Sequence, residues 1–179
     1  MPLPNLIEIL PLTSPVTAHI TVPGSKSITN RALILAALAK GETTLAGALW
    51  SEDTQIMVKA LQAMGFSLVV REDLNEVCNR TIIVSGEGGR IPQMPADIFV
   101  GNAGTAARFL AAFVCLGDGS IKLHGIDRMH ERPQFGLFQA LRMLGYQVDA
   151  ADDTLPAVIH GSGSREASCK VSLSESSQF

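Results

Sequence analysis

The stretch Thr21-Val22-Pro23-Gly24-Ser25-Lys26-Ser27-Ile28-Thr29-Asn30-Arg31 decides how this chain is organised. The alternating run over residues 18–22 predicts a strand, which the proline and glycine end. A helix is then predicted to begin at Ser25 or Lys26. The first N–H groups of a helix lack internal partners and carry partial positive charge. With Lys26 and Arg31 they favour a phosphate or carboxylate site, although an ordinary serine cap with solvated basic residues has the same sequence.

The same arrangement recurs further along the chain. A short predicted strand over 96–100 leads into Gly101-Asn102-Ala103-Gly104-Thr105, and a predicted helix follows over 106–116. The spacing from Gly24 to Gly101 is 77 residues, and Arg31 and Arg108 have the same spacing. Self-similarity at a long fixed period indicates a repeated structural unit. The recurrence also favours a built anion site over an ordinary helix cap.

Each copy predicts strands and helices in the order β-α-β-α-β-β, so the fold class is predicted as mixed α/β (α+β). The further elements of the first copy are predicted at 43–45, 51–65, 66–70 and 81–84. Those of the second are predicted at 121–123, after Pro133, at 146–148 and at 157–159. A strand over 169–173 would open a third copy. The predicted divisions are an N-terminal segment 1–16, a first unit 17–90, a second unit 91–165 and the start of a third unit 166–179.

Composition limits the classes of function. The 179 residues are 46% hydrophobic and 17% charged, which suits a globular core, and the net charge of −3 argues against a nucleic-acid surface. Three widely spaced cysteines favour reduced thiols, and four scattered histidines predict no metal site. No leader-like start or membrane-spanning apolar run is visible. The expectation is a cytoplasmic protein without a membrane or nucleic-acid partner.

The second unit differs from the first before its second helix. Where the first has Ser51-Glu52-Asp53, the second has Asp127-Arg128-Met129-His130-Glu131-Arg132-Pro133. Arg128 and Arg132 precede a helix N-terminus, where cations are unfavourable unless an anion is bound. The alternative is that both arginines pair with neighbouring acids at the surface. Guanidinium groups bind carboxylate and phosphate through two parallel bonds, which favours the anion site.

Four motifs together resemble a known family. Neither glycine-rich loop matches a P-loop or a dinucleotide fingerprint. In order and spacing, however, four stretches resemble the 3-phosphoshikimate 1-carboxyvinyltransferase (EPSP synthase) family: residues 23–32, residues 101–108, residues 128–133 and Ser176-Ser177-Gln178-Phe179. The resemblance implies an enolpyruvyl-transferase (EPT-like) fold, an inside-out α/β barrel built from β-α-β-α-β-β units. It implies transfer of the enolpyruvyl group of phosphoenolpyruvate to shikimate 3-phosphate with release of phosphate, in the shikimate pathway of aromatic amino-acid biosynthesis.

The resemblance also assigns roles to residues, with no metal and no cofactor. Lys26 and Arg132 are implied as catalytic. The implied shikimate 3-phosphate contacts are Lys26, Ser27, Arg31, Ser176, Ser177 and Gln178. The implied phosphoenolpyruvate contacts are Lys26, Gly104, Arg132 and Gln178. Two anionic substrates side by side need positive charge to offset their repulsion.

The sequence departs from the family pattern in two respects, and two alternative functions stay open. Family members are about twice as long and carry a second domain with acid/base carboxylates, so a complementary C-terminal half chain is expected as partner. Residues 1–16 are expected to pair with that missing domain. Phe109 stands where many herbicide-sensitive members carry proline, which makes glyphosate a possible inhibitor of altered strength. The alternatives are the related UDP-N-acetylglucosamine enolpyruvyl transferase and a non-catalytic anion-binding module of the same fold.

Overall fold

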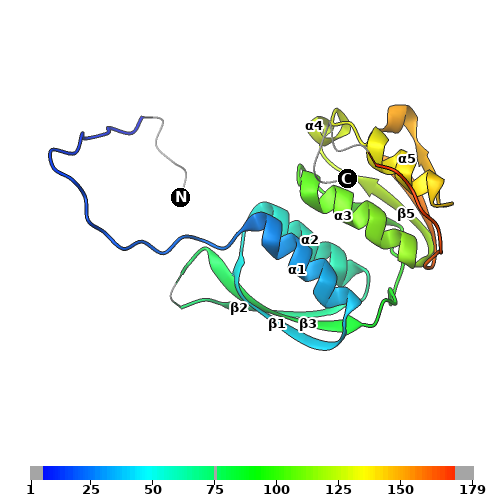
Figure 1. The fold of residues 1–179 in the computed structure, drawn as a ribbon, viewed down its shortest axis with the longest axis horizontal. Helices are drawn as coiled ribbons and strands as arrows, with labels where there is room; N and C mark the ends of the chain where they lie inside the picture. The colour runs from blue at the N-terminus through cyan, green and yellow to red at the C-terminus, as the bar shows by residue number, and fades with distance from the viewer. Residues whose placement is uncertain (1–5, 75, 172–179) are drawn as a thin grey trace.

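The computed structural model describes residues 6–74 and 76–171. Its first half consists of α1 (Lys26–Leu38), β1 (Lys40–Leu49), α2 (Glu52–Ala63), β2 (Ser67–Glu72) and β3 (Asn79–Glu87). The strands form an antiparallel sheet in the order β1-β3-β2, and α1 and α2 lie on one face of it (Figure 1). Leu33 of α1, Leu61 of α2 and Val84 of β3 are fully buried between the layers.

The second half follows the same plan with one more strand. It consists of β4 (Asp97–Phe99), α3 (Gly104–Phe113), η1 (Val114–Leu116), β5 (Asp118–His124), α4 (Asp127–His130), α5 (Phe135–Met143), β6 (Gln147–Ala150), η2 (Ala151–Asp153) and β7 (Ala157–Ser162). The sheet order is β4-β5-β7-β6, with β4 parallel to β5 and the other pairs antiparallel. One buried apolar cluster runs through both halves, so they share a core. The predicted mixed α/β class is confirmed.

Helices α1 and α3 pack against each other and run in the same direction. The Arg31 guanidinium in the second turn of α1 lies 5.2 Å from the centre of the Phe109 ring in the second turn of α3. Nearer the helix C-termini, Ile34 and Leu38 line one groove with Phe113 and its neighbours on α3. The N-termini of α1 and α3 therefore lie at the same end of the layer.

A close contact between two backbone segments, possible only because one residue is glycine, occurs in both halves. An ideal Cβ on Gly24 would lie 2.2 Å from the carbonyl oxygen of Gly47, and one on Gly125 would lie 2.3 Å from that of Gly101. In the first half, therefore, the loop before α1 touches the last part of β1, and in the second half the loop before α3 touches the residue that follows β5. Any side chain at Gly24 or Gly125 would separate these backbones.

The first predicted strand is wrong. Residues 18–22 form no strand in the structure, and the side chains of Ile20 and Val22 are 82% and 68% exposed. Figure 1 shows the described N-terminal residues running away from the packed body. Alternation indicates which side chains share a face, but a strand also needs a neighbour to pair with, and none of the described strands pairs with this segment.

The predicted strand over 169–173 also fails where it can be examined. Residues 169–171 are not in a strand, and residues 172–173 lie outside the described residues. The predicted strand at 43–45 is the centre of the longer β1, whose register with β3 shifts between Leu45 and Ala48. The short helix α4 and its turn occupy the stretch predicted only as an approach to Pro133.

Candidate functional site

The start of α1 gathers three of the predicted site residues. Ser25 caps the helix, with its hydroxyl oxygen accepting from the Ile28 N–H at 3.4 Å. The Lys26 ammonium lies 3.1 Å from a carboxylate oxygen of Asp53 in the first turn of α2. Ser27 lies in the first turn, and its carbonyl oxygen accepts from Arg31 Nη1 at 3.0 Å. Lys26, Ser27 and Arg31 thus lie at one end of α1, and Lys26 bridges the starts of two helices.

Buried hydroxyl groups fix the starts of α1 and α2 to the end of β1. Thr29 is 5% exposed, and its oxygen accepts from the Leu49 N–H at 3.1 Å. Thr54 is fully buried and donates to the Leu49 carbonyl oxygen at 2.7 Å. Because both helices are tied to the same residue, the distance between their N-termini is set by backbone as well as by side-chain packing.

At the start of α3, a guanidinium group occupies the space that a side chain would fill. An ideal Cβ on Gly104 would lie 2.5 and 2.6 Å from the two terminal nitrogens of Arg132. One of these nitrogens donates to the Asn102 carbonyl oxygen at 3.3 Å. The N-cap residue Ala103 has no side-chain hydrogen bond to the helix. The resemblance implies Gly104 as a phosphoenolpyruvate contact, and the structure places the guanidinium of Arg132 against it.

This end of α3 concentrates positive charge. Arg108 is 7% exposed and donates to the Pro133 carbonyl oxygen at 3.4 Å. Burial lowers the pKa of Arg108, and the nearby charge of Arg132 lowers it further. A cavity of about 490 Å³ is lined by Asn102, Arg128, Glu131, Arg132 and Pro133. Two neighbouring guanidinium groups beside an uncapped helix N-terminus repel one another, and a bound anion would offset that repulsion.

The predicted residues fall into two neighbouring groups. Lys26, Ser27 and Arg31 lie at α1, and Gly104 and Arg132 lie at α3, which packs beside it. Ser176, Ser177 and Gln178 lie outside the described residues. Sequence reasoning assigned no role to the buried Arg108, although its 77-residue spacing from Arg31 was a usable signal.

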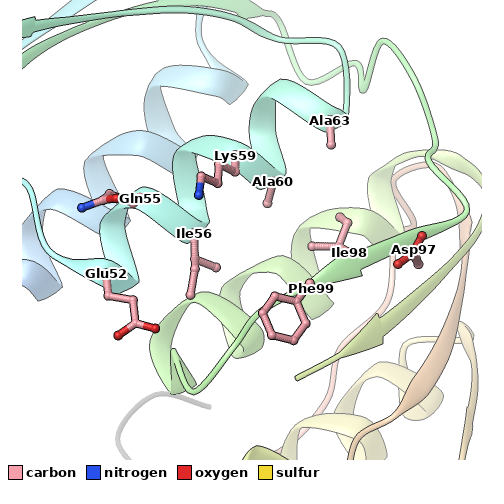
Figure 2. A pocket seen from close by; sticks show the side chains of 9 residues that line it. All are labelled: Glu52, Gln55, Ile56, Lys59, Ala60, Ala63, Asp97, Ile98 and Phe99. Atoms are coloured by element: carbon pink, nitrogen blue, oxygen red, sulfur yellow. The ribbon is translucent and has the colours of Figure 1, made fainter. Parts of the chain in front are cut away.

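A separate cavity lies between α2 and β4 (Figure 2). It measures about 360 Å³ and is lined by Glu52, Gln55, Ile56, Lys59, Ala60, Ala63, Asp97, Ile98 and Phe99. Ile56 and the half-exposed Phe99 give it an apolar middle, with Glu52 and Asp97 at its edges. None of the predicted site residues that the structure describes lines this cavity.

The outer face of the second sheet carries a serine, histidine and aspartate set that sequence reasoning did not find. Ser120 Oγ lies 2.7 Å from His160 Nδ1, and His160 Nε2 lies 2.7 Å from an Asp149 carboxylate oxygen. The hydrogen bond from His160 lowers the pKa of Asp149. The set joins β5, β7 and β6 side by side on an exposed face and lines none of the cavities described above. It cross-links the strands.

Comparison with known proteins identifies the family. The fold is mixed α/β, with basic side chains gathered at the N-termini of two adjacent helices. Residues 11–179 match the EPSP synthase (3-phosphoshikimate 1-carboxyvinyltransferase) family. The chain belongs to this family.

Individual relatives agree with this assignment. The chain is 44% identical over 183 residues to a 3-phosphoshikimate 1-carboxyvinyltransferase of Opitutus terrae, covering 100% of this chain and 41% of that protein. It is 44% identical over 159 residues to the protein of the same name from Trichormus variabilis, covering 88% of this chain and 36% of that protein. The solved EPSP synthase of Acinetobacter baumannii superposes with a TM-score of 0.71 at 27% identity, covering 82% of this chain and 32% of that one.

The chain spans about two fifths of the length of the curated relatives it matches. No helix among the residues that the structure describes is both long and apolar enough to cross a bilayer. Within the same residues, no group of three or more histidine, cysteine or acidic side chains is placed to hold a metal ion.

Proposed function

We propose that this chain forms one part of the site that transfers the enolpyruvyl group of phosphoenolpyruvate to shikimate 3-phosphate. The observation that carries the proposal is the packing of Arg132 against Gly104 at the uncapped start of α3. Neighbouring α1 adds Lys26, Ser27 and Arg31 at the same end of the layer. A cation held at a positive helix end costs free energy that a bound carboxylate or phosphate recovers.

The proposed roles follow from the two groups of residues. Lys26, Ser27 and Arg31 bind the phosphate of shikimate 3-phosphate, and Arg132 with the α3 amide groups binds phosphoenolpyruvate. Ser176, Ser177 and Gln178 are proposed as further contacts on the family resemblance alone. Two negatively charged substrates can then lie side by side because each faces a separate source of positive charge.

The reaction needs groups beyond those at the two helix ends. The shikimate hydroxyl loses its proton as its oxygen bonds to the central carbon of phosphoenolpyruvate, and the methylene carbon accepts a proton to become a methyl group. The methyl group then gives up a proton as the bond from the central carbon to the phosphate oxygen breaks, so phosphate leaves and the carbon–carbon double bond forms again. Lys26 can take part in proton transfer, but its neighbour Asp53 is engaged in the ion pair with it. We therefore assign the remaining acid/base groups to a complementary C-terminal half, as the resemblance implies.

Exposed apolar surface supports a larger assembly. A groove of about 290 Å³ between α1 and α3 is lined by Ile34, Leu38, Phe109, Ala112, Phe113 and Leu116. Leu6, Ile9, Leu10 and Leu12 near the N-terminus are each more than three quarters exposed. Both surfaces suit burial against further parts of an inside-out barrel of repeated units and its second domain. The division into an N-terminal segment, two units and the start of a third remains part of this proposal, as does a cytoplasmic location.

The test is complementation. The chain is mixed with a C-terminal half made from the Opitutus terrae relative, and phosphate release is measured with both substrates. Turnover by the mixture and none by either half supports the proposal. Arg132→Lys serves as the matched variant, because it keeps the charge but loses the paired nitrogens, and should raise the KM for phosphoenolpyruvate. Turnover by this chain alone would reject the need for a second half.

The second candidate function is an anion-binding module without turnover, which the ion pair between Lys26 and Asp53 favours because it engages both groups with each other. Calorimetry separates the two functions: a module binds shikimate 3-phosphate or phosphoenolpyruvate but releases no phosphate with any complementary half. Binding of UDP-N-acetylglucosamine in place of shikimate 3-phosphate would instead indicate the related transferase.

Inhibition by glyphosate is a further part of the proposal. The Phe109 ring lies under the Arg31 guanidinium, so it is positioned to influence a proposed substrate contact directly. Phe109→Pro removes this ring and should change the inhibition constant of the assembled enzyme. An unchanged constant would show that residue 109 does not affect the inhibitor site.

A further inference from the structure

One buried side chain at the start of β3 reaches the loop before α1. The Asn79 side-chain oxygen accepts from the Gly24 N–H at 2.8 Å, although the two residues are 55 positions apart. Asn79 is 7% exposed and is the first residue of β3, where it pairs with Leu49 of β1. Gly24 immediately precedes the helix cap Ser25. The asparagine therefore contacts the backbone directly before the proposed phosphate-binding turn.

The second half of the molecule holds its equivalent loop differently. There β4 pairs with β5, the Val100 N–H donates to the His124 carbonyl oxygen at 2.8 Å, and the Ile126 N–H donates to that of Gly101 at 3.1 Å. In the first half, residues 18–22 form no strand, so the described structure provides no such ladder before Gly24. In the first half, the Asn79 side chain holds the loop before α1, whereas backbone pairing holds the equivalent loop in the second half.

The loop at Gly24 also packs tightly against the backbone of β1. Gly24 lies so close to the backbone of Gly47 and Leu49 that an ideal Cβ would be 2.2 Å from the Gly47 oxygen and 2.8 Å from the Leu49 nitrogen. The loop is thus pressed onto the irregular part of β1 on one side and bonded to Asn79 on the other. The hydrogen bond is part-buried, and removal of the Asn79 oxygen would take away the acceptor that this N–H has in the structure.

We infer that Asn79 is a positioning residue, which sets the start of α1 so that Lys26 and Ser27 face the bound phosphate. The part of this inference that concerns the bound phosphate rests on the proposed function. Asn79 itself makes no contact with substrate; it acts through the backbone of Gly24.

The first measurement tests the positioning alone. Hydrogen exchange of the Gly24 amide is measured by NMR in the full chain and in the variants Asn79→Ala and Asn79→Asp. We expect the amide to be protected in the parent chain, to exchange about tenfold faster in Asn79→Ala, and to recover protection in Asn79→Asp, which keeps the acceptor oxygen. Thr81→Ala, two residues along the same strand, is the matched control. An unprotected Gly24 amide in the parent chain overturns the inference, whether or not Asn79→Ala folds.

The second measurement tests the consequence for ligand. Inorganic phosphate is titrated into the chain and the shifts of the first-turn amides of α1 and α3 are followed separately. Asn79→Ala should weaken the response at α1 about tenfold and leave that at α3 unchanged, whereas a general loss of stability would weaken both. Equal weakening at α1 and α3 overturns the inference. No response at α1 in the parent chain counts against the proposed function, while the exchange result still decides the role of Asn79.

Discussion

Replacing Gly86 with alanine should destabilise the first half of the molecule by driving β3 away from α1. An ideal Cβ at Gly86 would lie 2.3 Å from the carbonyl oxygens of both Ala36 and Ala39. These are backbone atoms at the end of a helix, so no rotamer change can relieve the overlap. Next to the clash, the Gly88 N–H donates to the Ala39 oxygen at 2.8 Å and would be pulled out of range.

The magnitude follows from these contacts. To reach an acceptable contact, helix and strand must separate by roughly 0.7–1 Å, which interiors packed like crystals resist. Overpacking of this kind costs about 1–3 kcal/mol, and the strained hydrogen bond adds about 1 kcal/mol. Alanine also restricts the unfolded chain, which returns about 0.4–1 kcal/mol. The net loss is about 1–3.5 kcal/mol, or a fall in Tm of about 2–14 °C.

The assay is urea unfolding with a matched control. Gly117→Ala would place its Cβ 2.3 Å from the sulfur of Met94, and a methionine side chain can rotate away, so we expect a cost below about 1 kcal/mol. Gly161, the counterpart of Gly86 in the second half, has a Cβ position 2.4 Å from the Val114 carbonyl oxygen and should behave like Gly86. Equal costs for Gly86→Ala and Gly117→Ala would refute the distinction between backbone and side-chain contacts.

Three further predictions concern the site and its surroundings. Gly104→Ala should leave Tm nearly unchanged, because the Arg132 side chain can rotate away from the new methyl group. The same change should weaken phosphoenolpyruvate binding about tenfold by calorimetry, and an unchanged affinity would contradict the proposed role of Arg132. Asp53→Asn releases Lys26 from its ion pair and should tighten inorganic phosphate binding roughly threefold at low salt, and weaker binding would contradict this. Burial raises the pKa of Cys115 to about 12. At pH 8 the thiol should therefore be alkylated roughly a thousandfold more slowly in the folded protein than in the unfolded protein, which mass spectrometry of the modified thiol measures. Because the unfolded thiol loses its proton first, near pH 9, the contribution of Cys115 to stability is present below pH 9 and is lost as pH rises towards 12.

Features with local causes could be predicted from the sequence. The start of α1 at Lys26 follows from the break at Gly24 and the serine cap, and these act within a few residues. The recurrence of Gly24 at Gly101 predicted a second helix start, and α3 begins at Gly104.

Features that depend on distant neighbours could not be predicted. The strand over 18–22 failed because alternation carries no information about a pairing partner. Arg132 packs against Gly104 from a different segment of the chain, and no local sequence pattern predicts this contact. The set of Ser120, Asp149 and His160 exists only because the register of β5, β6 and β7 brings the three side chains together.

The shared direction of α1 and α3 has a consequence for how the molecule holds together. Adjacent helices that point the same way have aligned dipoles, so their positive poles repel at one end of the layer. In this chain Arg132 adds to that repulsion rather than relieving it. On the proposed function, a bound oxyanion would offset this repulsion, and the melting temperature should rise with the logarithm of the anion concentration once that concentration exceeds Kd. Anion binding and stability would then depend on the same few atoms.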